Sequence, residues 1–318
     1  MIPDAAQRDR AIGAVLASAA GDALGSQYEF GPALPDDLVP QFGRGHFGHD
    51  VGEWTDDTSM AVPILQVLAD GDSLDDPVAL GRIVSAWKGW AGTALDVGTQ
   101  TRGVLASIVG PITEQAALAA SRAAHDASGR SGGNGSLMRT GPVALGYLDG
   151  EPAGLAAAAV RVAKLTHWED DNADACALWC LAIRHAVLTG ELDVRAQLPW
   201  IPAERRDRWS TLIDAAMEPG AHPRQFSETN GWVVTAFQSA LAAVAGATSL
   251  VDAVERAVRG GNDTDTVAAI AGSLAGAVWG AGAVPTPWRA TLHGWPGLRS
   301  DDLVVLVDRV TAGHRETS

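Results

Sequence analysis

The stretch VAAIAGSLAGAVWGAGAV, from Val267 to Val284, has no charged side chain over 18 positions, and it decides the fold class. Glycine recurs in it at every fourth position, at Gly272, Gly276 and Gly280. In a lipid bilayer that spacing would be the dimerising face of a membrane helix. The stretch contains more Ala and Gly than Leu and Ile, however, and this composition favours a helix in a soluble protein. We therefore expect a helix that is buried on all sides and packed closely against its neighbours.

Most of the remaining chain also has helical periodicity, with apolar residues three and four positions apart. The predicted helices are Ala5–Leu24, Thr58–Ala69, Pro77–Gly92, Gln115–Ala127, Gly154–Leu165, Ala173–Leu188, Arg205–Met217, Gly231–Ala245, Leu250–Gly260 and Thr266–Gly280. Alternating Val, Ile and Thr, the pattern of a strand, is nearly absent. We therefore expect an all-α fold, a compact orthogonal bundle of on the order of ten to thirteen helices. Leu188–Arg208 most resembles a linker, but motifs on both sides depend on one another, which predicts a single domain over residues 1–318.

The charge balance limits the possible partners. The chain has 38 acidic and 23 basic residues, which gives a formal net charge of −15. This charge argues against general nucleic-acid binding, which needs a basic face, and against docking on an anionic membrane. It also repels a phosphate-bearing substrate unless bound cations reverse the local field. Of the acids, 27 are Asp and 11 are Glu. Asp is the one that prefers helix caps, turns and metal sites.

The two cysteines and the N-terminal region bear on the cellular compartment. Cys176 and Cys180 lie four positions apart, on one face of a helix, so we expect reduced core residues and no disulfide framework. The apolar run Ala11–Gly21 is not a cleaved signal sequence, because Asp4 and Asp9 replace the basic residues that precede such a run. Both observations predict a cytoplasmic protein.

A first group of oxygen-bearing side chains opens a predicted helix at Trp54–Thr58, where Thr55, Asp56, Asp57 and Thr58 follow one another. A helix cap needs only one such residue, and capping is the simpler interpretation of each. Four in a row splay hydroxyl and carboxylate oxygens around one point. This arrangement suits a hard cation such as Mg²⁺, Mn²⁺ or Ca²⁺.

A second group, Gly260–Thr266, precedes the uncharged helix and repeats this chemistry with Asp263, Asp265 and Thr266. It is not an EF-hand, because the Glu at the twelfth position of such a loop is missing. Helix capping is again the alternative. A buried helix that begins with two carboxylates must nevertheless find partners for them, since their desolvation costs several kcal/mol, about 2–7 for a polar group alone. The two groups together predict a site for two cations.

With these motifs the sequence resembles the ADP-ribosylglycohydrolase family, which includes the dinitrogenase reductase-activating glycohydrolases. Six motifs occur in the family's order between about residue 12 and about residue 285: Gly21–Gly25 followed by Glu29, Trp54–Thr58, Asp96–Gly98, Gly132–Arg139, Thr166–His167 and Gly261–Thr266. The resemblance implies an all-α fold with two divalent cations, Mg²⁺ or Mn²⁺, at the floor of a cleft. The implied ligands are Thr55, Asp56, Asp57, Asp263, Asp265 and Thr266.

Glu29 and Asp96 are the two candidates for acid and base catalysis. The resemblance places Glu29 near the cations and the anomeric carbon, as a ligand or as the general base, whereas an exposed acid after a helix is the alternative. Asp96 competes for the same role. The alternative is that Asp96 caps a helix that begins near Thr99. Glycosidic hydrolysis uses one group to activate water and another to help the leaving group. The sequence does not order the two residues between these tasks.

The glycine-rich segment Gly132, Gly133, Asn134, Gly135 and Ser136 presents backbone N–H groups without side-chain obstruction. It lacks the Lys of a P-loop, and a flexible surface loop is the alternative. The resemblance implies that it holds the pyrophosphate or the distal ribose of ADP-ribose, aided by Arg139 and by His167. The alternative for Arg139 is an ion pair with a local acid. The alternative for His167 is a favourable contact with the dipole at the end of a helix. Trp168, Glu169 and Asp170 follow His167, where the family commonly has a second His; this departure concerns the outer substrate contacts.

The segment Phe42–Gly52 precedes the first acidic group and carries Arg44, His46, Phe47 and His49, which are candidates to close over a substrate. We therefore interpret the chain as a cation-dependent hydrolase. It would cleave the glycosidic bond between ADP-ribose and an acceptor, either an ADP-ribosylated protein or a small ADP-ribose conjugate. The alternatives are a non-catalytic ADP-ribose-binding or structural family member, and another two-metal hydrolase such as a phosphoesterase, whose usual sites include His ligands.

Overall fold

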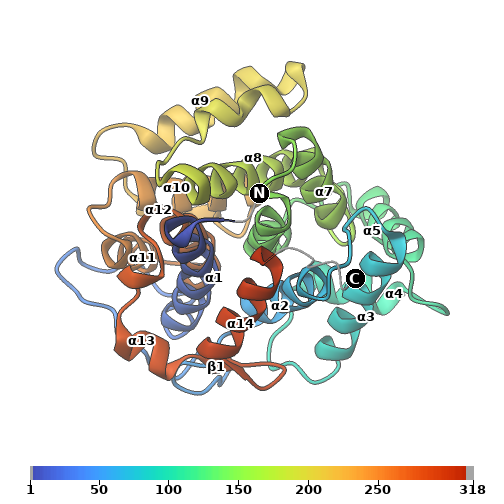
Figure 1. The fold of residues 1–318 in the computed structure, drawn as a ribbon, viewed down its shortest axis with the longest axis horizontal. Helices are drawn as coiled ribbons and strands as arrows, with labels where there is room; N and C mark the ends of the chain where they lie inside the picture. Colours follow the sequence, from blue (N-terminus) through green and yellow to red (C-terminus); the bar gives the residue numbers. More distant parts are fainter. Residues whose placement is uncertain (1–2, 313–318) are drawn as a thin grey trace.

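In the computed structural model, which describes residues 3–312, helices dominate the chain and the all-α prediction is confirmed (Figure 1). The α-helices are α1 (Ala5–Gly25), α2 (Asp56–Ala69), α3 (Pro77–Ala91), α4 (Thr99–Ser107), α5 (Glu114–Ser128), α6 (Leu137–Thr140), α7 (Pro152–Lys164), α8 (Asp170–Thr189), α9 (Arg206–Met217), α10 (Val233–Ala245), α11 (Leu250–Arg259), α12 (Thr264–Trp279), α13 (Thr286–Thr291) and α14 (Ser300–Thr311). Short 3₁₀ helices lie between them, among them η2 (Gly141–Tyr147). The strands β1 (His293–Gly294) and β2 (Leu298–Arg299) form one antiparallel pair.

The centre of the fold is the contact between α1 and α12, the helix of the uncharged stretch. A Cβ atom added to Gly21 would lie 2.1 Å from the carbonyl oxygen of Ala268, and one added to Gly276 would lie 2.0 Å from the carbonyl oxygen of Gly13. Gly21 of α1 therefore meets Ala268 of α12, whereas the earlier Gly13 meets the later Gly276. This order shows that the two helices run antiparallel. The expected close packing of a fully buried helix is confirmed, and no helix within residues 3–312 is long and apolar enough to span a bilayer.

The other helices pack around this pair. Figure 1 shows α8, α10 and α11 near α12, and α2 and α14 near α1, as the residue contacts also show. Helices α3, α4 and α5 lie together on one side of the molecule, while α9 packs outside α10. Cys176 and Cys180 are buried on α8 without a disulfide, as predicted.

All ten predicted helices are present, with ends that differ by a few residues. The prediction omitted α14, although Leu303, Leu306 and Val307 are buried at helical spacing there. It also omitted α4, of which only the start near Thr99 was expected, and the two shortest helices, α6 and α13. The two shortest helices contain four and six residues, too few for periodicity to distinguish a helix from a turn.

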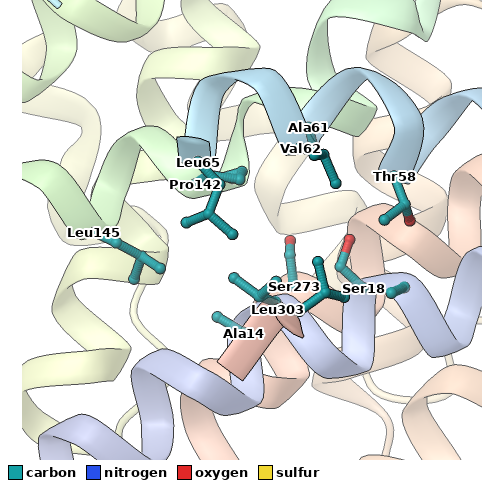
Figure 2. A pocket seen from close by; sticks show the side chains of 13 residues that line it. Ala14, Ser18, Thr58, Ala61, Val62, Leu65, Pro142, Leu145, Ser273 and Leu303 are labelled. Carbon is teal, nitrogen blue, oxygen red and sulfur yellow. The ribbon is translucent and has the colours of Figure 1, made fainter. Parts of the chain in front are cut away.

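A small cavity lies where α1, α2, α12, α14 and η2 meet (Figure 2). Its volume is about 20 Å³, which is room for a water molecule. Leu65, Leu145 and Leu303 supply apolar walls, and Ser18 and Ser273 contribute hydroxyl groups. This cavity belongs to the core and is separate from the cleft described next.

Candidate active site

A cleft of about 330 Å³ opens where the starts of α2, α4 and α12 meet the glycine-rich segment and the residues after α1. Most of the residues singled out in the sequence line it: Glu29, Asp56, Asp96, Gly133, Asn134, Gly135, His167, Asp263, Asp265 and Thr266. The fold therefore brings together six segments that are far apart in the sequence. The other candidates, Thr55, Asp57, Gly132, Ser136 and Arg139, lie around this lining but not in it.

The start of α2 is held by a side chain from α1. The Asp22 carboxylate accepts hydrogen bonds from the backbone N–H and the hydroxyl of Thr55, at 2.8 and 2.7 Å. It also accepts them from the backbone N–H and the hydroxyl of Thr58, at 2.9 and 2.6 Å. Thr55 makes no local side-chain cap of its own. Asp22 therefore makes the hydrogen bonds that a capping residue would make at this helix start, and it fixes the direction of the Asp56–Asp57 pair.

Two of the implied cation ligands lie next to the Asp22 contact. The Thr55 hydroxyl is 3.2 Å from Oδ2 of Asp57. Oδ1 of Asp57 is buried and has no hydrogen-bond partner among the described residues. A buried carboxylate oxygen without a donor is costly, and a bound cation would satisfy it.

The start of α12 is held by backbone contacts and neutral amides. The Thr264 hydroxyl donates to the carbonyl oxygen of Gly25, at 2.9 Å. The side chain of Asn134 donates to Oδ2 of Asp263, at 2.7 Å, and Oδ1 of Asn230 accepts from the backbone N–H of Asp263, at 3.1 Å. Asn230 also donates to the carbonyl oxygen of Gly261, at 3.1 Å. These contacts turn the carboxylate of Asp263 toward the cleft.

Carboxylates from both helix starts crowd the floor of the cleft. Carboxylate oxygens of Glu29, Asp263 and Asp265 lie within 4.8 Å of one another. Burial and the negative charge of Asp263 raise the pKa of Glu29 to about 9. Burial and the charge of Asp96 raise the pKa of Asp56 to about 8. Burial raises the pKa of Asp265 well above its usual value, with Glu29 and Asp57 adding to the shift.

Whether divalent cations fit this site depends on the charges and donor atoms around these carboxylates. No Lys, Arg or His within residues 3–312 forms an ion pair with Glu29, Asp56, Asp57, Asp263 or Asp265. Their donors are hard oxygens, the ligand type that Mg²⁺ and Mn²⁺ take. Oδ1 of Asp57, which is buried without a hydrogen-bond donor among the described residues, is a further oxygen that suits a cation. The residues present therefore fit divalent cations.

Asp96 also lines the cleft, from the loop that precedes α4. Burial raises its pKa, while the positive fields of His49 and Arg102 oppose that rise. Asp96 does not cap α4, whose N-cap is Gly98. The alternative interpretation of Asp96 as a helix cap is therefore not supported, and its side chain faces the cleft.

The glycine-rich segment forms the wall beside Asp263. Asn172 from α8 donates to the carbonyl oxygen of Gly133 and to the Ser136 hydroxyl, both at 2.7 Å. The Gly132 carbonyl accepts from the backbone N–H of Val233, at 2.9 Å. The segment is therefore anchored at both ends and is not a loose surface loop. Gly133 and Gly135 line the cleft, whereas Ser136 is buried behind it.

Arg139 is not where a substrate-binding residue would lie, whereas its neighbour His167 is at the cleft. Arg139 is 0% exposed and lies over the ring of Trp87, with its guanidinium carbon 4.1 Å from the ring centroid. Its Nη2 donates to the Thr166 hydroxyl, at 2.5 Å. A direct substrate contact by Arg139 does not fit this burial, because its side chain does not reach the cleft. His167, which Thr166 contacts in turn, does line the cleft.

Aromatic side chains stand at the rim of the cleft. Phe30 is 58% exposed and Phe47 is 40% exposed, and both line the cleft. His46 lies between them, with ring centroids 5.3 Å from Phe30 and 5.0 Å from Phe47. Phe30 has a φ of 60°, and its N–H donates to the carbonyl oxygen of Asn262, at 2.7 Å. Of the other rim candidates, Arg44 is exposed and His49 is buried beside a neighbouring cavity.

Asp22 and Asn230 are the residues that sequence reasoning did not single out. Asp22 belongs to a motif that was noticed, but nothing local shows that its carboxylate reaches another helix. Asn230 precedes Gly231 in what reads as an ordinary turn. An isolated buried polar residue would have been the signal, and burial is not visible in the sequence.

Comparison with known proteins agrees with this geometry. The family model described as ADP-ribosylglycohydrolase matches residues 3–318. The chain is 32% identical over 284 residues to the ADP-ribosylarginine hydrolase Tri1 of Pseudomonas putida strain GB-1, covering 88% of this chain and 73% of that protein. It is 27% identical over 292 residues to the ADP-ribosyl-[dinitrogen reductase] glycohydrolase of Rhodospirillum rubrum, covering 89% and 90%. A solved structure described as an ADP-ribosylglycohydrolase-related protein complex matches with a TM-score of 0.70 and 25% identity, over 96% of this chain and 98% of that one.

Proposed function

We propose that this chain, which belongs to the ADP-ribosylglycohydrolase family and is a hydrolase of ADP-ribosyl glycosidic bonds, acts at the acidic cleft on ADP-ribosylated arginine. The observation that carries the proposal is that five carboxylates line one cleft beside an anchored glycine-rich wall, and that none of them forms an ion pair among the described residues: Glu29, Asp56, Asp96, Asp263 and Asp265. An acidic floor and an N–H-rich wall suit a substrate that combines a ribose with a pyrophosphate.

Two divalent cations, Mg²⁺ or Mn²⁺, are the proposed cofactors. Thr55, Asp56, Asp57, Asp263, Asp265 and Thr266 would hold them, with Glu29 at the edge of this set. When bound, such cations supply positive charge that binds ribose hydroxyls and lowers the pKa of a water molecule. They would also lower the raised pKa values of the surrounding carboxyl groups, because an opposite charge favours the ionised form.

Glu29 and Asp96 are the proposed acid and base. Both line the cleft, from segments on either side of Asp56. Hydrolysis needs a carboxylate that removes a proton from water and a carboxyl group that gives one to the leaving group. The two groups have different surroundings, because Glu29 lies among the aspartates of the proposed cation site whereas His49 and Arg102 lie near Asp96. The variants Glu29→Gln and Asp96→Asn should therefore each remove a different limb of the pH–rate profile.

The proposed acceptor is arginine. The relative at 32% identity is named an ADP-ribosylarginine hydrolase. In this chain the exposed rings of Phe30 and Phe47 lie beside Glu29 at the rim of the cleft. A guanidinium group packs well on an aromatic face, and Arg does so more often than other cationic side chains. A leaving arginine would find such a surface directly above the acidic floor.

The test is release of ADP-ribose from peptides ADP-ribosylated on arginine or on serine, followed by chromatography with Mg²⁺, with Mn²⁺ and with a chelator. We expect rapid release from the arginine-linked peptide in the presence of a cation and none with the chelator. Asp301→Ala, on the exposed side of α14, is the matched control that keeps full activity. Binding of ADP-ribose without release from either peptide would contradict the proposal, as would release that survives chelation.

A further inference from the structure

A short chain of buried hydrogen bonds runs from Arg139 to the cleft. Arg139 and Thr166 are both 0% exposed, and His167 is 2% exposed. Nη2 of Arg139 donates to Oγ1 of Thr166, at 2.5 Å, and this oxygen lies 2.8 Å from Nδ1 of His167. The backbone is fixed at the same point, because Gln100 donates to the carbonyl oxygen of Thr166, at 2.9 Å.

The positions of the protons in this chain follow from the donors available. A guanidinium group has N–H donors and no acceptor, so the Thr166 oxygen must accept from Arg139. The hydroxyl of Thr166 has one proton to donate, and the contacts of residues 3–312 offer it one acceptor, Nδ1 of His167. A neutral imidazole that accepts at Nδ1 carries its proton on Nε2. Burial and the charge of Arg139 hold the pKa of His167 well below its usual value, so the ring stays neutral.

The Nε2 atom of His167 faces the glycine-rich wall of the cleft. A Cβ atom added to Gly135 would lie 3.3 Å from Nε2, and one added to Gly133 would lie 3.4 Å from it. All three residues line the cleft. Within the described part of the chain, Nε2 forms no hydrogen bond, so its N–H is a free donor at the wall of the cleft. The absence of a side chain at both glycines keeps the approach to it open.

We propose that Arg139 and Thr166 are positioning residues that hold His167 in its Nε2–H tautomer, so that this N–H donates to an oxygen of the ADP-ribosyl group. The identity of the bound group rests on the proposed function, whereas the tautomer does not. The proposal assigns Arg139 a role that is compatible with its complete burial. Its guanidinium acts on the substrate through two intervening side chains and never touches it.

The tautomer is measured by the ¹⁵N chemical shifts of the imidazole in labelled protein, with His167→Gln to assign the signals. We expect the unprotonated shift at Nδ1 and the protonated shift at Nε2. Thr166→Val, which keeps the shape of the side chain but removes the hydroxyl, should abolish this preference, and Thr166→Ser should retain it. Arg139→Met should weaken it while Trp87 keeps its place. An Nδ1–H tautomer in the wild-type protein, or wild-type shifts in Thr166→Val, would overturn the proposal.

Affinity for ADP-ribose, measured by calorimetry, completes the test. A hydrogen bond to a charged oxygen contributes enough that Thr166→Val should bind ADP-ribose about 10-fold more weakly. In turnover it should raise KM by a similar factor, with kcat within about 2-fold of the wild-type value. Thr166→Ser should bind like the wild type. Failure of the wild type to bind ADP-ribose contradicts the proposed function. ADP-ribose that binds but leaves the Nε2 shift unchanged overturns the donor role of His167.

Discussion

The starts of α2 and α12 look alike in the sequence and are held in different ways in the structure. Counted from its N-cap residue, each begins with two aspartates and two threonines, and neither N-cap residue makes its own side-chain cap. At α2, the single carboxylate of Asp22 accepts four hydrogen bonds from two threonines. At α12, the neutral amides of Asn134 and Asn230 share the task with the backbone of α1.

The difference shows how a helix start can be kept free to bind a ligand. In an isolated helix, an Asp or Thr at the start spends its oxygen on the local N–H groups. At α2 the Asp22 carboxylate accepts from the N–H groups of Thr55 and Thr58. The carboxylate of Asp56 is therefore free to line the cleft. At α12 Asn230 accepts from the N–H of Asp263, while Asp265 accepts from a local N–H, that of Thr266, at 2.8 Å. The start of α2 depends on one charged group, whereas that of α12 depends on several neutral ones. A single substitution should therefore damage the first more than the second.

Replacement of Asp22 is expected to have the largest effect. Asp22→Ala leaves two backbone N–H groups and two hydroxyl groups without their acceptor in a buried site. Hydrogen bonds to a charged group are stronger than those between neutral groups, so the free energy of unfolding should fall by about 3 kcal/mol or more. Because the Asp56–Asp57 pair loses its support, kcat/KM should fall by about 100-fold or more. Denaturant unfolding and steady-state turnover measure the two effects.

Asp4→Ala is the matched control on the same helix. Asp4 caps α1 from an exposed position, and its loss should cost about 1 kcal/mol without changing turnover. A similarly small loss of stability for Asp22→Ala, with full activity, would show that Asp22 does not organise the start of α2.

Replacement of Asn230 should have a smaller effect. Asn230→Ala removes the acceptor for Asp263 N–H and for the Asn262 side chain, together with one donor to Gly261. Because these bonds are neutral, we expect a loss of about 2 kcal/mol in unfolding free energy and about a 10-fold fall in kcat/KM. Gln238→Ala is the control that should leave kcat/KM unchanged. It removes the hydrogen bond that the side-chain amide of Gln238 on α10 donates to the carbonyl oxygen of Leu212. If Asn230→Ala were as damaging as Asp22→Ala, the contrast between the two helix starts would be wrong.

The pH dependence of stability tests the carboxylates of both helix starts together. The pKa of Glu29 is about 9 and that of Asp56 about 8 in the folded protein, whereas both are about 4 in an unfolded chain. The folded state therefore binds protons more tightly, and the stability of the cation-free protein should fall as the pH rises from about 4 to about 9. We expect the thermal midpoint in chelator to decrease over this range, and Mg²⁺ to flatten the curve. A midpoint in chelator that rises toward pH 9 would contradict this account of the carboxylates.

The sequence predicted the helices better than the contacts between their ends. The spacing of glycines in Val267–Val284 and the apolar periodicity elsewhere are local signals, and they led to a correct fold class. The acidic starts of α2 and α12 are local signals too, and both were identified. Asp22 and Asn230 could not be recognised, because their partners lie 31 or more residues away in the sequence and only the fold brings them together.

Arg139 is a residue that the sequence did single out, but for a contact that its surroundings do not allow. A basic residue after a glycine-rich segment suggests an anion contact. Its actual neighbours are Trp87 and Thr166, which come from two other helical regions. A sequence shows which side chain is present but not which ones surround it. Residues that support the site from behind are therefore harder to predict than those that line it.

The most direct test of the account is Mn²⁺ binding by calorimetry to the wild-type protein and to Asp56→Asn and Asp263→Asn, with turnover of the arginine-linked peptide measured on the same samples. The account predicts two Mn²⁺ ions per wild-type chain. Each variant should lose at least one of them and its turnover while the helical circular dichroism signal is retained. Two bound ions in both variants, or turnover that persists in either one, would contradict the claim that the two helix starts together form a site for two cations.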